Sequence, residues 1–282
     1  MNPSTVYDKF DEHVTLIRPR PGWIAIDWRE LWESRELLYF LVLRDIKVRY
    51  KQTVLGVAWA VLQPVMSMLV FTVIFGRLAK MPSEGFPYAI FVYTGLLPWT
   101  FFSTAVATSS QSLLNQQALL TKIYLPRLYV PSAAMGSGVV DFAVSFVFFG
   151  CLMAYYGVSP GWGLLAMPAL VALTIVASLG VGLALSAVTV TYRDFRYVTP
   201  FLIQVWMYLS PVIYPVSIVP SEWQWLLAIN PMVGIIDAFR AALLGRPWNL
   251  ATLAISALSS FALLAYGLFY FRRTERRFAD VA

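Results

Sequence analysis

A dense cluster of basic side chains stands where the chain turns from charged to uncharged and apolar. Its members, called here the basic collar, are Arg44, Lys47, Arg49 and Lys51, with Tyr50 between the last two. Cations at a membrane edge attract anionic lipid head groups, and Arg binds phosphate through paired hydrogen bonds. The cluster therefore favours binding of an anionic head group at a membrane surface. Leu55 and Gly56 follow the collar, and Gly56 would let the backbone approach that head group closely.

The same cations would alternatively serve only to orient the first membrane span, as basic flanks commonly do. The residues around them predict a helix over 28–51, because Asp27 and Glu30 fit the N-cap and N3 positions of a capping box. Its middle, 37–43, is apolar but too short to cross a membrane. We predict an amphipathic helix in the cytoplasmic interface, preceded by a polar tail over 1–27.

Residue types that perform catalysis or bind metals are scarce. His13 is the only histidine and Cys151 the only cysteine, which excludes a zinc site built from these residues and Ser-His-Asp catalysis in the membrane core. No lysine stands in a G-x-x-x-x-G-K-[ST] pattern, so the chain has no P-loop for ATP. We expect no catalytic residue, no metal site and no cofactor in this chain.

Asp141 is the only ionisable residue well inside a predicted span. An acid at membrane depth is a functional candidate by default. A proton-driven carrier normally needs several acids or histidines along one path, however, and this chain offers one. The alternative is a structural aspartate at a helix contact, and the small residues Gly136, Ser137 and Gly138 nearby favour close helix packing.

The elements that must position these residues are membrane-spanning helices. Hydrophobic residues make up 59% of the 282-residue chain and charged residues 13%, against about 25% charged in soluble domains. Long stretches contain no Asp, Glu, Lys or Arg, and each span needs about 20 apolar residues. We predict an all-α polytopic membrane protein with six transmembrane helices, at about 54–76, 87–109, 131–156, 164–190, 198–219 and 250–271, within a transmembrane domain over 52–271.

The lysines and arginines also predict an orientation. Seventeen of the 21 lie before the first span, in the loops after spans two and four, and in a basic tail over 272–282. The positive-inside rule then places both termini in the cytoplasm. The net charge of +6 mostly reflects this asymmetry, and it favours an anionic membrane surface over nucleic acid. The first residues lack a signal-peptide pattern, so we expect the first span to anchor the protein directly.

Residues 111–125 join spans two and three on the predicted cytoplasmic side. Leucines recur there at helical spacing among Gln and Asn, and Pro126 would stop the helix. We predict a short amphipathic helix of the kind that a soluble partner holds, and the alternative is a simple connector. The residues expected to contact such a partner are Leu113, Leu114, Gln117, Leu120 and Lys122.

The fifth predicted span, 198–219, cannot form one straight helix, because Pro211 and Pro215 interrupt it. Asn230 and Pro231 fit an N-cap followed by proline at N1, and Gly245 fits the position just after a helix. The predicted helix over 231–244 is too short to span.

Asp237 and Arg240 lie three residues apart on that helix and would pair on one face. We predict two short re-entrant helices within 211–245 that form a gate on the outer side. Broken backbone at membrane depth is tolerated where protein buries it or water lines it. The alternative is an ordinary outer loop that rests in the interface.

Aromatic residues make up 16% of the chain and gather at predicted span ends. An interfacial belt is one explanation. The other is a path for sugars, whose C–H faces stack on aromatic rings. The residues that would line such a path are Trp99, Phe101, Phe102, Trp206, Tyr208 and Tyr214.

A series of short motifs, in order, resembles the membrane subunits of polysaccharide-export ABC-2 transporters, the family that exports O-antigen, teichoic acid and capsule. The motifs are RDIKVRYKQ (44–52), VLGVAW (54–59), QP (63–64), TGLLPW (94–99), YRD (192–194), SPV (210–212), NP (230–231) and AFR (238–240). The resemblance begins near residue 28 and does not cover the N-terminal tail.

The resemblance implies a permease subunit that works as a homodimer with two copies of a separate ATPase, which would bind ATP and Mg²⁺. The implied substrate is a polysaccharide on polyprenyl pyrophosphate, moved across the bacterial inner membrane. The implied entrance for the pyrophosphate comprises Arg44, Lys47, Arg49, Tyr50, Lys51, Leu55 and Gly56. The implied outer gate comprises Pro211, Pro215, Asn230, Pro231, Asp237 and Arg240, and residues 111–125 would match the coupling helix.

Three other functions would fit parts of the same sequence. An ABC-2 exporter of a drug or lipid would share the fold and have a narrower path. An intramembrane transferase would need clustered acids or histidines, and a proton-coupled carrier would need a chain of them. Asp141 is the only acid well inside a predicted span, which counts against both the transferase and the proton-coupled carrier.

Overall fold

The computed structural model describes residues 28–51, 56–117, 125–159 and 161–275, and within these ranges every regular element is a helix. The elements are α1 (Trp28–Glu33), α2 (Arg35–Lys51), α3 (Ala58–Phe71), the π-helix η2 (Thr72–Leu78), α4 (Tyr88–Asn115), α6 (Tyr129–Ala134), α7 (Gly136–Tyr156), the 3₁₀ helix η3 (Trp162–Ala166), α8 (Met167–Thr191), α9 (Phe195–Tyr208), the 3₁₀ helix η4 (Val216–Ile218), α10 (Ser221–Ala228), α11 (Pro231–Leu244) and α12 (Leu250–Glu275). The predicted tail over 1–27 and the predicted site residues Leu55, Leu120 and Lys122 lie outside the described residues.

The predicted all-α polytopic membrane fold is confirmed. In the described part of the chain, the helical segments long and apolar enough to cross a membrane are Ala58–Leu78, Tyr88–Asn115, Tyr129–Tyr156, Trp162–Thr191 and Leu250–Glu275. The pair formed by α10 and α11 adds a sixth span if it is counted as one. The last segment continues through Arg272 and Arg273, which the sequence had placed in the C-terminal tail.

The fifth predicted span differs from the structure. Helix α9 has 14 residues and ends at Tyr208, so it is only about 21 Å long. Instead of continuing through 209–219, the chain turns before Pro211 and Pro215, as proline in a helix interior requires. The prolines therefore end this helix early and leave the backbone that leads to α10 without helical hydrogen bonds.

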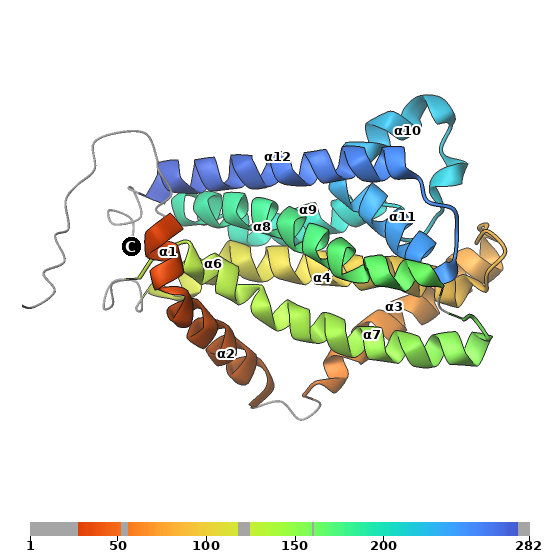
Figure 1. The fold of residues 1–282 in the computed structure, drawn as a ribbon, viewed down its shortest axis with the longest axis horizontal. Helices are drawn as coiled ribbons and strands as arrows, with labels where there is room; N and C mark the ends of the chain where they lie inside the picture. The colour runs from red at the N-terminus through yellow and green to blue at the C-terminus, as the bar shows by residue number, and fades with distance from the viewer. Residues whose placement is uncertain (1–27, 52–55, 118–124, 160, 276–282) are drawn as a thin grey trace, which may run out of the picture.

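Helix α4 lies in the middle of the bundle (Figure 1), where it contacts α3, α6, α7, α8, α9 and α11. Its aromatic side chains Phe91, Tyr93 and Phe102 are fully buried. Phe149 of α7 and Phe239 of α11 complete the same core. Helices α3, α7, α8, α9 and α11 all pack on this one, so α4 sets the positions of the elements around it.

The predicted interface helix over 28–51 is two helices, because the chain breaks at Ser34 between α1 and α2. Helix α2 is inclined to the bundle and leads to α3 (Figure 1). It packs on α6 and α7 through the buried Leu41, while Tyr39 and Phe40 stay exposed. A Cβ atom at Gly136 would lie only 2.5 Å from a methyl of Val42, so the glycine allows this close contact.

Helices α8 and α12 cross with their backbones in direct contact. A Cβ atom on Gly267 would lie 2.2 Å from the carbonyl oxygen of Gly180. A Cβ atom on Gly180 would lie 2.5 Å from the backbone nitrogen of Leu264. Small residues bring helices this close inside membranes, where packing rather than water exclusion drives association.

Replacing Gly180 by leucine is expected to force α8 and α12 apart and lower the melting temperature of the purified protein, at a cost of about 1–3 kcal/mol for overpacking. The matched control is Gly150→Leu, because a Cβ atom there meets nothing within 4 Å. Thermal unfolding in detergent measures both. Equal melting temperatures for the two variants would contradict the close crossing of α8 and α12.

Candidate functional site

The basic collar occupies the last turns of α2, but its four cations have different surroundings. Lys47 and Lys51 are exposed, whereas Arg44 and Arg49 are half-buried. Arg44 donates to Asp45, with N–O distances of 2.8 and 3.0 Å, and to the Gln116 side chain at 2.7 Å. Arg44 is therefore held by the adjacent residue in α2 and by the residue that follows α4.

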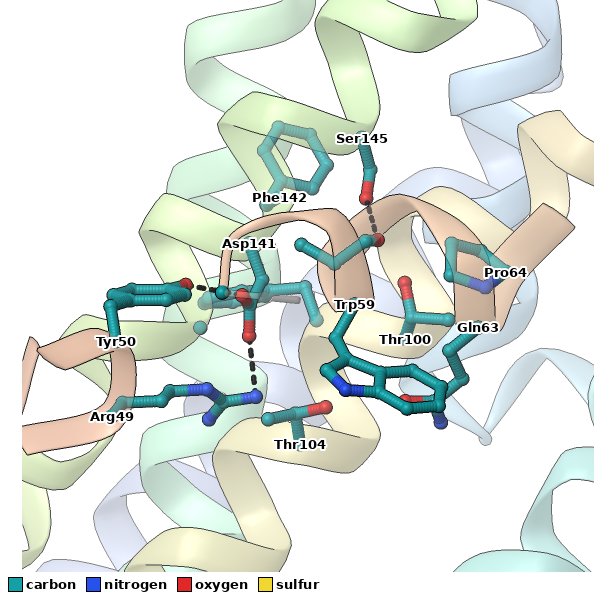
Figure 2. A pocket seen from close by; sticks show the side chains of 14 residues that line it. Arg49, Tyr50, Trp59, Gln63, Pro64, Thr100, Thr104, Asp141, Phe142 and Ser145 are labelled. Carbon is teal, nitrogen blue, oxygen red and sulfur yellow. Dashed lines mark hydrogen bonds and ion pairs between the residues drawn. The ribbon is translucent and has the colours of Figure 1, made fainter. Parts of the chain in front are cut away.

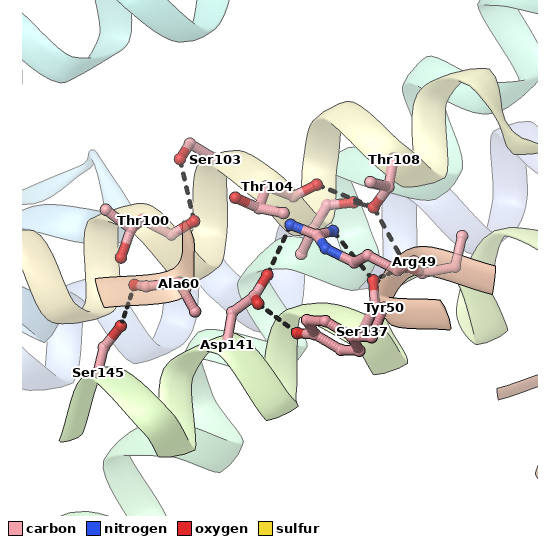
Figure 3. Close-up of polar contacts among 12 residues, drawn as sticks. Arg49, Tyr50, Ala60, Thr100, Ser103, Thr104, Thr108, Ser137, Asp141 and Ser145 are labelled. Atoms are coloured by element: carbon pink, nitrogen blue, oxygen red, sulfur yellow. Dashed lines mark hydrogen bonds and ion pairs between the residues drawn. The ribbon is translucent and has the colours of Figure 1, made fainter. Parts of the chain in front are cut away.

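Arg49 instead pairs with the intramembrane acid, Asp141 of α7. Its Nη2 lies 2.6 Å from Asp141 Oδ2, and its Nη1 donates to the Ser137 hydroxyl at 3.2 Å. The Tyr50 hydroxyl donates to the other carboxylate oxygen, so both oxygens are engaged (Figures 2 and 3). The acid thus joins the end of α2 to span three, which fits the sequence alternative of a helix-contact aspartate.

Tyr50 remains a hydrogen-bond donor in this arrangement. Burial raises the pKa of the Tyr50 phenol, and the hydrogen bond to Asp141 and the charge of that carboxylate raise it further. Arg49 acts in the opposite direction without reversing the shift. The phenol therefore keeps its proton at neutral pH and can donate to a carboxylate or to a phosphate.

A cavity of about 270 Å³ opens beside this pair. Arg49, Tyr50 and Asp141 line it, together with residues of α3, α4 and α7 (Figure 2). Trp59 and Gln63, from the VLGVAW and QP motifs, also line it, as do Thr100, Thr104 and Phe142, which lie in no motif. These residues come from three helices distant in the sequence, so no local pattern predicts that Thr100, Thr104 and Phe142 lie at one cavity.

Two backbone features shape the wall of this cavity. Gly56 lies in it with φ at +46°, a left-handed conformation that favours glycine. Pro64 has no N–H to bond the Ala60 carbonyl four residues earlier. The Ser145 hydroxyl of α7 donates to that carbonyl at 2.7 Å instead, so span one is held against span three (Figure 3).

The predicted coupling residues differ in how accessible they are to a soluble partner. Helix α4 continues to Asn115, so Leu113 and Leu114 belong to its last turn and not to a separate helix. Leu113 is buried in a cluster with Leu183 and Phe271, where a soluble partner cannot reach it. Leu114 and Gln117 are half-buried at the same end of the bundle.

The predicted path aromatics are mostly core residues. Trp99, Phe101 and Phe102 are buried, and the Phe102 ring lies 5.6 Å from Trp99 and 5.2 Å from Trp206. In this arrangement a sugar chain cannot reach Trp99 and Phe102, and Phe101 borders only the small cavity. Tyr214 is half-buried, while Tyr208 is 55% exposed on the surface of α9.

The predicted re-entrant segment has the helix ends expected from the sequence. Helix α11 runs over Pro231–Leu244, the Asn230 side chain accepts from Met232 N–H, and Gly245 has φ at +70°. Helices α10 and α11 meet at an angle of 100°. The Asn230 side chain also accepts from Trp206 Nε1 at 2.9 Å and donates to the Ser210 hydroxyl, so the bend is fixed to α9.

Arg240 does not form the predicted ion pair with Asp237. It is fully buried, and it donates to the carbonyls of Val212 at 2.8 Å and Tyr214 at 3.3 Å. Its guanidinium lies 3.8 Å from the centre of the Phe91 ring. Residues 209–215 after α9 are not helical, so their backbone carbonyls lack helical partners. Arg240 donates to these carbonyls and does not pair with Asp237.

Asp237 finds its partner outside α11. Arg246 lies 3.4 Å from the Asp237 carboxylate and 2.6 Å from that of Glu84, in the loop before α4. The acid therefore holds α11 to this loop through Arg246, while Arg240 holds the helix to the 209–215 turn. Gly95 of α4 makes room for that turn, since a Cβ there would lie 3.0 Å from the Val212 carbonyl oxygen.

A helical bundle with broken backbone at one end and a basic collar at the other defines a multi-pass membrane protein, and comparison with known proteins identifies its family. Residues 36–244 match the ABC-2 type transporter family. The chain is 32% identical to the O-antigen export system permease protein RfbA of Myxococcus xanthus, over 88% of this chain and 96% of the relative. This chain belongs to the ABC-2 transporter family.

Two further relatives extend the comparison. The O-antigen export system permease protein RfbA of Klebsiella pneumoniae is 24% identical, over 87% of this chain and 95% of its own length. The polysialic acid transport protein KpsM of Escherichia coli is 25% identical, over 83% of this chain and 92% of its own length. Each alignment covers most of both proteins.

Replacing Arg240 by methionine is expected to lower the melting temperature, because two buried carbonyls lose their donor at about 1–3 kcal/mol each. The control is Arg77→Met, which removes an exposed arginine. Thermal unfolding in lipid nanodiscs gives the comparison. A melting temperature equal to or above that of the wild type would mean that burying the guanidinium destabilises the protein at least as much as its contacts stabilise it. This result would contradict a structural role for Arg240.

Proposed function

We propose that this chain is the permease subunit of an ATP-driven exporter that moves a polysaccharide on polyprenyl pyrophosphate across the bacterial inner membrane. The observation that carries the proposal is Arg49, a 37% exposed guanidinium at the mouth of a cavity beside the first span. Relatives named for O-antigen and polysialic acid transport give the substrate class. A pyrophosphate concentrates negative charge, and Arg binds such groups through paired hydrogen bonds.

In this proposal phosphate binding is an exchange of partners. Asp141 already neutralises Arg49, so an incoming phosphate must replace that carboxylate. The exposed Lys47 and Lys51 would attract the head group over a longer range, and Tyr50 would donate to it on arrival. The collar then supplies attraction, while Arg49 supplies the specific contact.

The energy in this proposal comes from a second polypeptide. Because the sequence has no P-loop, two copies of a soluble ATPase would bind ATP and Mg²⁺ and associate with a homodimer of this chain. The segment after α4, which includes Gln117, is the proposed contact. Both chain termini would then lie in the cytoplasm with the collar, and α10 and α11 would face the other side.

An exporter of a lipid or drug is the second candidate function, and one observation favours it. A hollow of about 1000 Å³ between α8, α9, α10 and α12 is lined almost entirely by apolar side chains, with Trp206, Leu226 and Leu263 among them. Such a surface fits a lipophile better than a glycan. It does not contain the basic collar, and so it does not account for Arg49 and Asp141.

Replacing Arg49 and Lys51 together by alanine is expected to reduce surface polysaccharide at least tenfold, since losing even one charged hydrogen bond costs about 1.5–3 kcal/mol. Lipid-linked polymer would accumulate inside the cell. The control is Arg273→Ala, which removes an exposed cation at the end of α12. Glycan staining of cells and spheroplasts measures both pools, and wild-type export by the double variant would refute the proposed entrance.

Replacing Asp141 by asparagine is expected to raise the affinity for farnesyl pyrophosphate several-fold, because the phosphate no longer competes with a carboxylate for Arg49. Binding to the purified chain in nanodiscs provides the measurement. The control is Asp194→Asn, an exposed acid in the loop before α9. Weaker binding by the Asp141 variant would show that the acid orients Arg49 and would exclude competition.

A further inference from the structure

A second hollow lies beside Arg49, with a volume of about 440 Å³. This hollow, called here the amide hollow, has a lining with many polar side chains: Asp45, Arg49, Thr108, Gln111, Ser112, Asn115, Gln116 and Ser137. None of these residues except Arg49 belongs to the entrance described above. Because Arg49 lines this hollow and also the cavity beside Trp59, its side chain stands between the two.

The two charged side chains of the amide hollow are already paired, Asp45 with Arg44 and Arg49 with Asp141. Its remaining hydroxyl and amide groups favour an uncharged ligand with many hydroxyl groups. An Asn or Gln side chain presents a donor and an acceptor side by side, as neighbouring sugar hydroxyls do. Gln111 and Asn115 lie four residues apart on α4 and therefore share one face. The oxygen of Gln116 accepts from Arg44, which leaves its amide N–H₂ as a donor toward the hollow.

The position of the hollow along α4 fits a ligand that enters from the end of the bundle where α1 lies. Gln111 and Asn115 line the amide hollow near the end of α4, whereas Thr100 and Thr104 line the deeper cavity. Seven residues separate Thr104 from Gln111, or about 10 Å of helix. Figure 3 shows Arg49 beside Thr104 and Thr108, between these two levels.

We propose that the amide hollow binds the first sugar attached to the pyrophosphate. The inference rests on the proposed function and adds a subsite to it. Arg49 holds the phosphate, while Gln111 and Asn115 bond the hydroxyls of the sugar on the side from which the glycan arrives. The volume lies within the range of small-ligand sites, about 300–1000 Å³. The prenyl chain stays in the bilayer beside α2 and α3.

The test measures binding to the purified chain alone in phosphatidylcholine nanodiscs, so that no ATPase contact enters the result. The probes are farnesyl pyrophosphate, the same lipid carrying either N-acetylglucosamine or galactose, and inorganic pyrophosphate. The wild type is expected to bind at least one sugar-bearing probe about tenfold more tightly than farnesyl pyrophosphate, as two added hydrogen bonds would give. Weaker binding of inorganic pyrophosphate would identify the lipid-linked form as the ligand.

The double variant Gln111→Ala with Asn115→Ala is expected to lose that tenfold preference and to bind farnesyl pyrophosphate within twofold of the wild type. The single variant Asn115→Ala, at an exposed position, leaves the core intact and should lose part of the preference. The matched control is Gln63→Ala, which removes an amide from the deeper cavity. This control should keep the full preference.

Three results would overturn the inference. Equal wild-type affinity for bare and sugar-bearing lipids would mean that no sugar subsite exists. Loss of the preference in Gln63→Ala alone would place the sugar in the deeper cavity. An equal loss for every probe in the amide variants would assign the hollow to phosphate binding or to folding. Failure of the wild type to bind any pyrophosphate lipid would instead count against the proposed function itself.

Discussion

No water reaches the hydrocarbon interior of a bilayer, so a charge or freed carbonyl placed there must find its partner within the protein. Asp141, inside the third span, meets this requirement through Arg49, and Arg240 meets it through the backbone carbonyls of the turn after α9. The Ser145 hydroxyl does the same for the Ala60 carbonyl that Pro64 leaves unpaired. Each contact joins segments far apart in the sequence, and together they fix α2, α3 and α11 against the central helices.

Arg240 and Arg49 differ in the exposed fraction of their side chains, and this difference separates their roles. Arg240 is 0% exposed and is held by two carbonyls and an aromatic face, so exchanging its partners would require unpacking α11. Arg49 is 37% exposed and borders two hollows, so a ligand reaches it without disturbing the core. The first contact is suited to holding a bend, and the second to exchanging one anion for another.

The sequence predicted features that depend on local chemistry. The spans, the Asn230 cap, Pro231 at N1 and the left-handed Gly245 follow from composition and from backbone rules that operate over a few residues. The Arg49–Asp141 pair joins residues 92 positions apart and had no local signal. The same limit explains why Asp237 was paired with Arg240. Helical spacing permits that pair, but the unpaired carbonyls of the 209–215 turn were not visible in the sequence.

The distribution of burial bears on where a polymer would pass. Most of α4 is buried, and Trp99, Phe102 and Phe239 fill the interior around it, so the described residues of a single copy leave no continuous path along its centre. By contrast, α3 and α9 leave apolar side chains such as Val70, Phe201 and Tyr208 exposed. A polymer too wide for the packed interior therefore needs a passage between two such faces. This supports the proposal of a homodimer whose path lies between the copies, next to the first span and the entrance at Arg49.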